Sequence, residues 1–150
     1  MAEAAAATIL LVEDDPGHAR LIERNLRRNR VHHEIVQIPD GQSALDYLYS
    51  RGDYQNQPRP DRLVVLLDLN LPRLDGYQVL RHLKADPFTQ KIPVVVLTTT
   101  EDAREVDRCY ELGCSIFLTK PVNYTEFSDT LRRLGELLSV VKVPSGCLPP

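Results

Sequence analysis

The stretch Leu63-Val64-Val65-Leu66-Leu67 is apolar at every position and is followed directly by Asp68. A strand that faces water on one side alternates apolar and polar residues, whereas a strand covered on both faces is apolar throughout. The run Pro93-Val94-Val95-Val96-Leu97 has nearly the same character. Two runs of this kind favour a parallel sheet that carries helices on both of its faces.

Short apolar runs alternate with longer amphipathic stretches along the rest of the chain. The runs expected as strands are Thr8–Val12, Val31–Ile38, Leu63–Leu67, Ile92–Leu97 and Ser115–Thr119. Apolar residues recur at helical spacing in the stretches that follow them, which indicates βαβ units. Because crossovers between parallel strands are right-handed, the sequence predicts an α/β fold with a doubly wound, five-stranded parallel sheet in the order 2-1-3-4-5.

The composition is that of one globular domain. The 150 residues include 18 basic and 21 acidic side chains, for a net charge of −3, and 43% of the residues are apolar. No apolar run can span a bilayer, the start lacks the basic region of a signal peptide, and the cysteines form no CxxC pair. We therefore expect a cytoplasmic protein without a membrane segment. The mildly acidic balance argues against nucleic acid as a partner.

We expect a folded domain over residues 8–140. The low-complexity start, residues 1–7, is expected to be a disordered N-terminus. Residues 141–150 form a tail with three prolines, and no helix-turn-helix output domain fits there. The output of the chain is therefore expected to be a contact with another protein.

Polar side chains follow the strands that the predicted order brings together. Glu13-Asp14-Asp15 follows the first strand and Asp68 the third, while Thr98 and Lys120 end the fourth and fifth. In such a sheet the ligand crevice lies beyond the carboxyl ends of the strands. A cluster of carboxylates without His or Cys suits Mg²⁺, and a hydroxyl and an ammonium beside it suit phosphoryl transfer.

Each of these residues also has an ordinary structural interpretation. Asp14 or Asp15, just before Pro16, could cap the first helix, and the run Thr98-Thr99-Thr100 could cap the fourth. Lys120 could be a solvated turn residue. The functional interpretation is favoured because all four strand ends that line one crevice carry the residue types that one reaction needs.

Five motifs, in this order and spacing, resemble the receiver domain of two-component response regulators, which has a flavodoxin-like fold. They are Ile9-Leu10-Leu11-Val12-Glu13-Asp14-Asp15, Leu66-Leu67-Asp68-Leu69-Asn70-Leu71-Pro72, Asp75-Gly76, Val96-Leu97-Thr98 and Phe117-Leu118-Thr119-Lys120-Pro121. The chain resembles, more narrowly, the small stand-alone regulators paired with bacterial phytochromes. This resemblance rests on the long loop before the third strand, the motif Asp68-Leu69-Asn70-Leu71-Pro72 and the run Val95-Val96-Leu97-Thr98-Thr99-Thr100.

The resemblance implies a role for each residue of the crevice. Asp68 accepts a phosphoryl group from the phosphohistidine of a sensor histidine kinase, and Lys120 pairs with a phosphoryl oxygen. Thr98 and Phe117 form the switch, in which the Thr98 hydroxyl moves inward and Phe117 follows. The implied ligands of Mg²⁺ are Glu13, Asp14, Asp68 and the backbone carbonyl of Asn70. Such a domain catalyses its own phosphorylation and dephosphorylation, and Asn70 and Thr100 are expected to set how long the phosphoryl group lasts.

The same resemblance implies two interaction surfaces. The first helix docks the kinase, which is expected to be of the phytochrome type. The residues assigned to this surface are His18, Arg20, Arg24, Arg27 and Arg28, although an ordinary solvated face would look similar. The fifth strand with the fourth and fifth helices is expected to form a homodimer. Tyr110, Tyr124, Val140, Val141 and Val143 could extend this dimer surface.

Three other functions remain open. A flavodoxin-like electron carrier would need a phosphate-binding loop where Glu13-Asp14-Asp15-Pro16 stands, and these acids would repel the flavin phosphate. A phosphatase of the haloacid dehalogenase type would need a second aspartate where Asn70 stands. A phosphorylation-independent adaptor would have the same fold, but the retained residues of the crevice argue against it. A phosphate sink would also have this fold, and the sequence does not separate a sink from a messenger.

Overall fold

The computed structural model describes residues 7–58 and 60–146. Five strands and five α-helices alternate along them, with a short 3-10 helix, η1, after the second α-helix. The elements are β1 (Thr8–Val12), α1 (Pro16–Arg28), β2 (Glu34–Ile38), α2 (Gly41–Leu48), η1 (Gly52–Tyr54), β3 (Leu63–Leu67), α3 (Gly76–Ala85), β4 (Val94–Thr98), α4 (Ala103–Leu112), β5 (Ile116–Thr119) and α5 (Tyr124–Val140).

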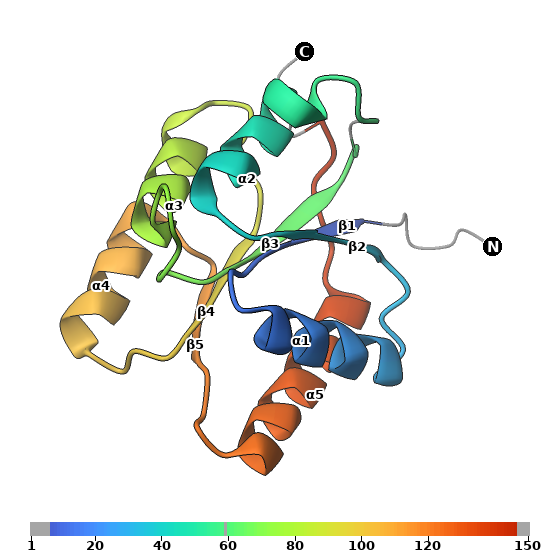
Figure 1. Ribbon diagram of the computed structural model, residues 1–150, viewed down its shortest axis with the longest axis vertical. Helices are drawn as coiled ribbons and strands as arrows, with labels where there is room; N and C mark the ends of the chain where they lie inside the picture. The colour runs from blue at the N-terminus through green and yellow to red at the C-terminus, as the bar shows by residue number, and fades with distance from the viewer. Residues whose placement is uncertain (1–6, 59, 147–150) are drawn as a thin grey trace.

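The strands form one parallel sheet in the order β2-β1-β3-β4-β5, which confirms the predicted fold. Helices α1 and α5 lie side by side on one face, and α2, α3 and α4 cover the other (Figure 1). Because successive side chains of a strand point to opposite faces, Leu10 and Val12 pack under α2 and α3, while Ile9 and Leu11 pack under α1 and α5. Burial on both faces explains why β1, β3 and β4 are apolar almost throughout.

The second strand is shorter than predicted. It begins at Glu34 rather than Val31, because α1 ends at Arg28 and Arg30 then turns the chain with a φ of 65°. Val31 is buried, but its carbonyl accepts a hydrogen bond from the Arg27 guanidinium instead of a neighbouring strand. The fourth and fifth strands also begin one or two residues later than predicted, at Val94 and Ile116.

The two ends of the described chain both lie at the amino edge of the sheet. Ala7, which we assigned to a disordered segment, is buried, and its amide donates to Nδ1 of His33; residues 1–6 lie outside the described part. Beyond α5, Ser145 bridges Arg62 in antiparallel fashion, and the amide of Gly146 donates to the Asp61 carbonyl. Residues 147–150 of the tail also lie outside the described part. Among the described residues, no helix is both long and apolar enough to cross a membrane.

Candidate functional site

Three acidic residues follow β1, and they have different surroundings. Glu13 is buried, whereas Asp14 and Asp15 are exposed. Asp15 caps α1, since its Oδ1 accepts from the amides of Gly17 (2.8 Å) and His18 (3.2 Å). These bonds, above all the one from His18, lower the pKa of the Asp15 carboxyl. The capping interpretation therefore holds for Asp15, which leaves Glu13 and Asp14 as the acids that face the crevice.

Asp68 lies at the carboxyl end of β3 and is 8% exposed. Its amide donates to the Val12 carbonyl, which extends the β1–β3 ladder to the site. One carboxylate oxygen, Oδ1, accepts from the Thr98 hydroxyl (3.0 Å) and from the Asn70 amide (3.2 Å). The other, Oδ2, lies 2.9 Å from Nζ of Lys120. Neighbouring strands thus hold the carboxylate in one orientation at the floor of the crevice.

Lys120 is almost fully buried and forms ion pairs with both Glu13 and Asp68. Its amide donates to the Thr98 carbonyl, so the β4–β5 ladder aims the side chain inward. Burial alone would lower the pKa of Lys120, but the two carboxylates outweigh it and raise the pKa, so Lys120 is a cation. Burial raises the pKa of Glu13 to about 7, against the opposing effect of Lys120.

The acidic side chains also form a possible metal centre. Glu13, Asp14 and Asp68 each offer a carboxylate oxygen, and these oxygens lie within 4.8 Å of one another. An all-oxygen donor set fits Mg²⁺ rather than a softer metal. Asn70, the fourth residue that we associated with the metal, follows Asp68 in the β3–α3 loop and is exposed. Three carboxylates facing one ammonium leave an excess of negative charge that a bound cation would balance.

The two residues expected to form a switch lie on adjacent strands. Thr98 is fully buried and its hydroxyl already contacts Asp68, so the inward orientation exists without a phosphoryl group. Phe117, paired in register with Val96, is partly buried against the core under α2 and α3. Its amide donates to the hydroxyl of Tyr110 on α4 (3.0 Å). This bond links α4 directly to the switch strand, and the sequence pattern gave no sign of it.

Two glycines fix the loop between β3 and α3. A Cβ on Gly76 would lie 2.3 Å from the Asp68 carbonyl oxygen, and a Cβ on Gly41 would lie 1.9 Å from the carbonyl oxygen of Leu74. Both distances are shorter than a Cβ atom can have to a backbone oxygen, so only glycine fits at these two positions without a shift of the loop. The first helical residue of α2 therefore touches the backbone of the loop that carries Asn70. On the same loop, the guanidinium of Arg73 contacts Asp40, the residue that caps α2.

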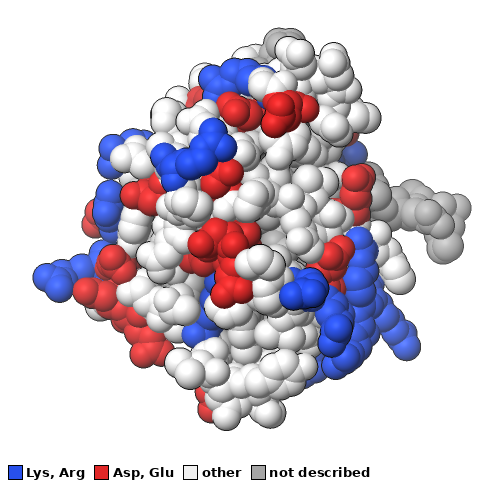
Figure 2. Space-filling view, in the orientation of Figure 1, with Lys and Arg blue, Asp and Glu red and all other residues white. Residues whose placement is uncertain are grey.

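The residues assigned to kinase docking separate into two groups. The arginines Arg20, Arg24, Arg27 and Arg28 are exposed on α1, and Figure 2 shows basic side chains gathered there beside the acidic crevice. However, the Arg27 guanidinium donates to the carbonyls of Val31 and His33. His18 instead lies at the crevice, where its Nδ1 is 3.3 Å from Nζ of Lys120. The signal for this contact was its position in the first turn of α1, three residues after Asp15.

The arrangement of the site is matched by a known family. Residues 9–132 match the family described as the response regulator receiver domain. The chain is a response regulator receiver domain. It is 44% identical over 138 residues to the response regulator Rcp1 of Synechocystis sp., covering 91% of this chain and 92% of that protein. This receiver domain therefore resembles the phytochrome-linked branch of the family, as the sequence motifs indicate.

Two solved structures extend the similarity to three dimensions. The receiver domain superimposes on the phosphorylated cyanobacterial phytochrome response regulator RcpA with a TM-score of 0.85, at 39% identity, over 94% of this chain and 100% of that one. With the Mn²⁺-bound form of Rcp1 the TM-score is 0.86, at 38% identity, over 93% and 99% of the two chains. Membership of the family makes a histidine kinase the class of partner and phosphoryl acceptance the class of activity.

Proposed function

We propose that Asp68 accepts a phosphoryl group from the phosphohistidine of a sensor histidine kinase of the bacterial phytochrome type. The observation that carries this proposal is the environment of the Asp68 carboxylate. It lies at the floor of the crevice, with a hydroxyl from Thr98 on one oxygen and the Lys120 ammonium on the other. The phytochrome-linked relatives support the kinase class.

In the transfer, a carboxylate oxygen of Asp68 forms a bond to phosphorus while the bond between phosphorus and the histidine nitrogen breaks. The electron pair of the broken bond stays on the imidazole of the kinase. Lys120 then pairs with one phosphoryl oxygen, and the Thr98 hydroxyl donates to another. The leaving imidazole nitrogen takes up one proton from the solvent, so the products are an aspartyl phosphate, which is a mixed anhydride, and a neutral histidine. Hydrolysis by the same site returns the free carboxylate, so the domain catalyses both steps of its own cycle.

The residues that would hold Mg²⁺ are Glu13, Asp14, Asp68 and the backbone carbonyl of Asn70. The clustered carboxylate oxygens of the first three support this assignment. A bound Mg²⁺ would offset the repulsion between the Asp68 carboxylate and the incoming phosphoryl oxygens. Lys120 pairs with Glu13 and Asp68, so its ammonium lies beside the Asp68 carboxylate, within reach of an oxygen of a phosphoryl group attached there.

The intact mass of the chain tests the phosphorylation site. After incubation with Mg²⁺ and a small acyl phosphate, we expect the mass of one phosphoryl group on the wild type and none on Asp68→Asn or in excess chelator. Asp53→Asn, which changes an exposed aspartate of η1, is the matched control and should be phosphorylated normally. Absence of the adduct under all conditions, including with a phosphorylated kinase, would favour the phosphorylation-independent adaptor.

We further propose that α1 docks the kinase. Arg20, Arg24 and Arg28 are exposed on it, whereas Arg27 and His18 have partners within the domain. The double variant Arg20→Glu/Arg24→Glu should slow transfer from the kinase at least tenfold and leave phosphorylation by acyl phosphate unchanged. Arg104→Glu, on exposed α4, should affect neither. Equal transfer rates in all three proteins would contradict docking through α1.

We propose that residues 8–140 act as a messenger through protein contacts, and that the face formed by α4, β5 and α5 forms a homodimer. Tyr110 is 49% exposed, Tyr124 59%, Val140 72% and Val141 37%, an apolar set that an interface would cover. Sedimentation should reveal a dimer that Val140→Asp weakens. A monomer at every protein concentration would contradict the homodimer.

The messenger role would be contradicted if the chain affected downstream signalling only by competing with other regulators for phosphoryl groups, because that behaviour identifies a phosphate sink.

A further inference from the structure

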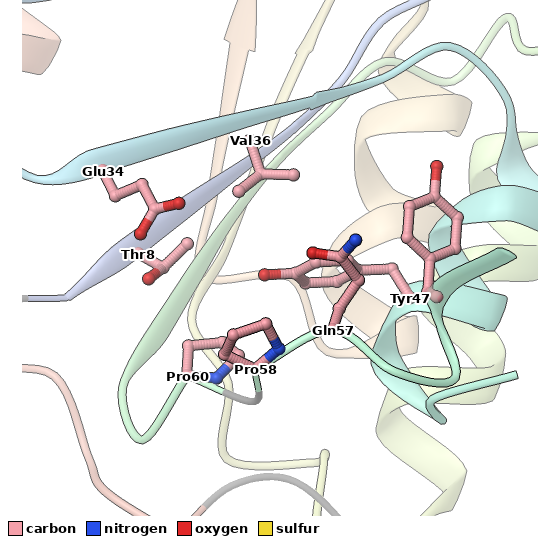
Figure 3. A pocket seen from close by; sticks show the side chains of 8 residues that line it. Thr8, Glu34, Val36, Tyr47, Gln57, Pro58 and Pro60 are labelled. Carbon is pink, nitrogen blue, oxygen red and sulfur yellow. The ribbon is translucent and has the colours of Figure 1, made fainter.

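A second cavity lies at the amino edge of the sheet, at the opposite end of β1 and β2 from Asp68. Its volume is about 250 Å³, enough for one large side chain. Figure 3 shows Glu34 and Thr8 on one wall and Gln57, Pro58 and Pro60 on the other, with Val36 and Tyr47 nearby. Tyr54 completes the lining. None of these residues takes part in the phosphorylation site.

The long segment between α2 and β3 builds this cavity. Gly52 bends the chain with a φ of 56° into η1, which ends in Tyr54. The ring of Tyr54 meets that of Tyr47, on α2, edge to face at a centroid distance of 5.6 Å. Both rings are partly buried against the core. The segment between α2 and β3 therefore forms one wall of the cavity.

The cavity carries negative charge. Glu34 is exposed, and it forms no ion pair with any described residue; nor does a described Lys or Arg line the cavity. The negative charge also affects the tyrosines of the cavity. Burial first, and Glu34 second, raise the pKa of Tyr47, and burial followed by Asp40 raises that of Tyr54. Aromatic faces attract an organic cation, and so does a carboxylate that, among residues 7–58 and 60–146, has no cationic partner.

The neighbouring strand edge indicates what kind of molecule carries the cation. β2 is the outermost strand, so its outer edge has no partner strand within the sheet. An extended peptide that pairs with such an edge places alternate side chains on one face. Glu34 and Val36, two residues apart on β2, both line the cavity. A side chain of the added peptide would therefore enter the cavity directly beside Glu34.

We infer that this cavity binds an arginine or lysine side chain of a partner protein whose extended segment pairs with the outer edge of β2. The cationic head pairs with the Glu34 carboxylate, and the apolar stem lies against Tyr47 and Tyr54. The Thr8 hydroxyl and the Gln57 side-chain carbonyl accept its remaining hydrogen bonds. The contact would supply an output surface at the edge of the domain, separate from the residues of the phosphorylation site.

The test is a titration of the ¹⁵N-labelled full chain with the blocked tripeptide acetyl-Val-Arg-Val-amide, followed by amide chemical shifts. We expect saturable shifts at Thr8, Val36 and Tyr47. The peptide with citrulline, the neutral isostere of arginine, should bind at least tenfold more weakly. Glu34→Gln should weaken the arginine peptide at least fivefold, whereas Glu111→Gln, an exposed change on α4, should not.

Several outcomes would overturn the inference. They are an absence of saturable shifts, equal binding of the citrulline peptide, or an unchanged affinity in Glu34→Gln. Propylguanidinium that binds as tightly as the peptide would show a small cation as the occupant instead. Binding seen only in Arg59→Gln would mean that the chain's own arginine, which lies outside the described residues, holds the cavity. Asp68→Asn should bind the peptide normally, so this inference and the proposed phosphorylation fail or succeed separately.

Discussion

At the scale of single residues, the site is organised around one buried cation. Lys120 is 3% exposed and holds together two carboxylates, of Glu13 and Asp68, that would otherwise repel each other. A buried charge loses the solvation of water and is stable only when it is paired. We therefore expect Lys120 to contribute to folding, in addition to its proposed role of pairing with a phosphoryl oxygen.

Lys120→Met should test the folding role. Removing the ammonium leaves Glu13 and Asp68 buried without a counter-ion, so the free energy of unfolding should fall by about 3 kcal/mol. Urea denaturation in the presence of a chelator measures this loss. Lys91→Met, an exposed change before β4, should leave the stability unchanged. A loss for Lys120→Met no larger than that of Lys91→Met would show that the two carboxylates are solvated or protonated in the folded chain.

The sequence identified the residue types of the site but did not distinguish the three acids after β1. Which acid caps α1 depends on where that helix begins, and the structure begins it at Pro16, so Asp15 is the cap. His18 was assigned to kinase docking, at the start of the first helix near the acidic crevice, because the family resemblance gives that role to this helix. The first turn of α1 places His18 near the crevice, but its partner Lys120 is 102 positions away, so the sequence alone did not identify the pair.

At the scale of elements, α2 contacts the β3–α3 loop, which carries the proposed metal ligand Asn70. Gly41 is the first residue of α2 and lies against the Leu74 backbone. Any side chain at position 41 must push the loop away. Because Asn70 belongs to this loop, its carbonyl would move with respect to Asp68. A residue with no chemistry of its own thereby positions a proposed metal ligand.

Gly41→Ala should lower stability by about 1–3 kcal/mol, the usual cost of overpacking a buried site, and should weaken Mg²⁺ binding at least threefold. Calorimetry of the metal and thermal unfolding measure the two effects. Gly17→Ala is the control, because a Cβ there meets only the flexible Asp15 side chain at 3.2 Å. Unchanged Mg²⁺ affinity in a stable Gly41→Ala protein would disprove the link between α2 and the metal ligands.

Element type was predictable where the apolar pattern was strong. The apolar runs predicted β3 and β4, and the apolar stripe at helical spacing predicted α5. The ends of these three elements in the structure lie within a few residues of the predicted ends. β2 was the weakest strand, because an edge strand needs to bury only part of its surface and includes the polar residues Glu34 and Gln37. The segment that forms η1 has no regular spacing of apolar residues, so the sequence pattern could not predict the cavity that this segment lines.

At the scale of the whole molecule, binding of a cation by the three clustered carboxylates would be coupled to folding, because they follow β1 and β3 and meet only in the folded chain. Saturating Mg²⁺ should therefore raise the unfolding temperature, by an amount equivalent to about 2.7 kcal/mol when its concentration is 100 times the dissociation constant. The comparison is between scans in Mg²⁺ and in chelator. Asp14→Asn should lose most of the increase, whereas Asp61→Asn should keep it; equal increases in both would place the ion elsewhere.

The strand order was predictable because so few chain paths connect five parallel strands with right-handed crossovers. The same topology decides where chemistry gathers, since every strand ends at one edge. The strand order does not determine which residues gather at the opposite edge of the sheet, because the loops decide that arrangement. There the tail, the start of β1 and the segment after α2 come together through pairings such as Ser145 with Arg62.

The return of the tail to Arg62 has a practical consequence for handling the molecule. Ala7 and Gly146 are both at the end of the sheet remote from Asp68. A chain tethered to a sensor chip or a bead near either of these residues would thus hold Asp68, the proposed phosphorylation site, toward the solution. Immobilised protein should exchange phosphate with a soluble kinase as readily as free protein does, and fluorescent labels at the two termini would leave the reacting groups unobstructed.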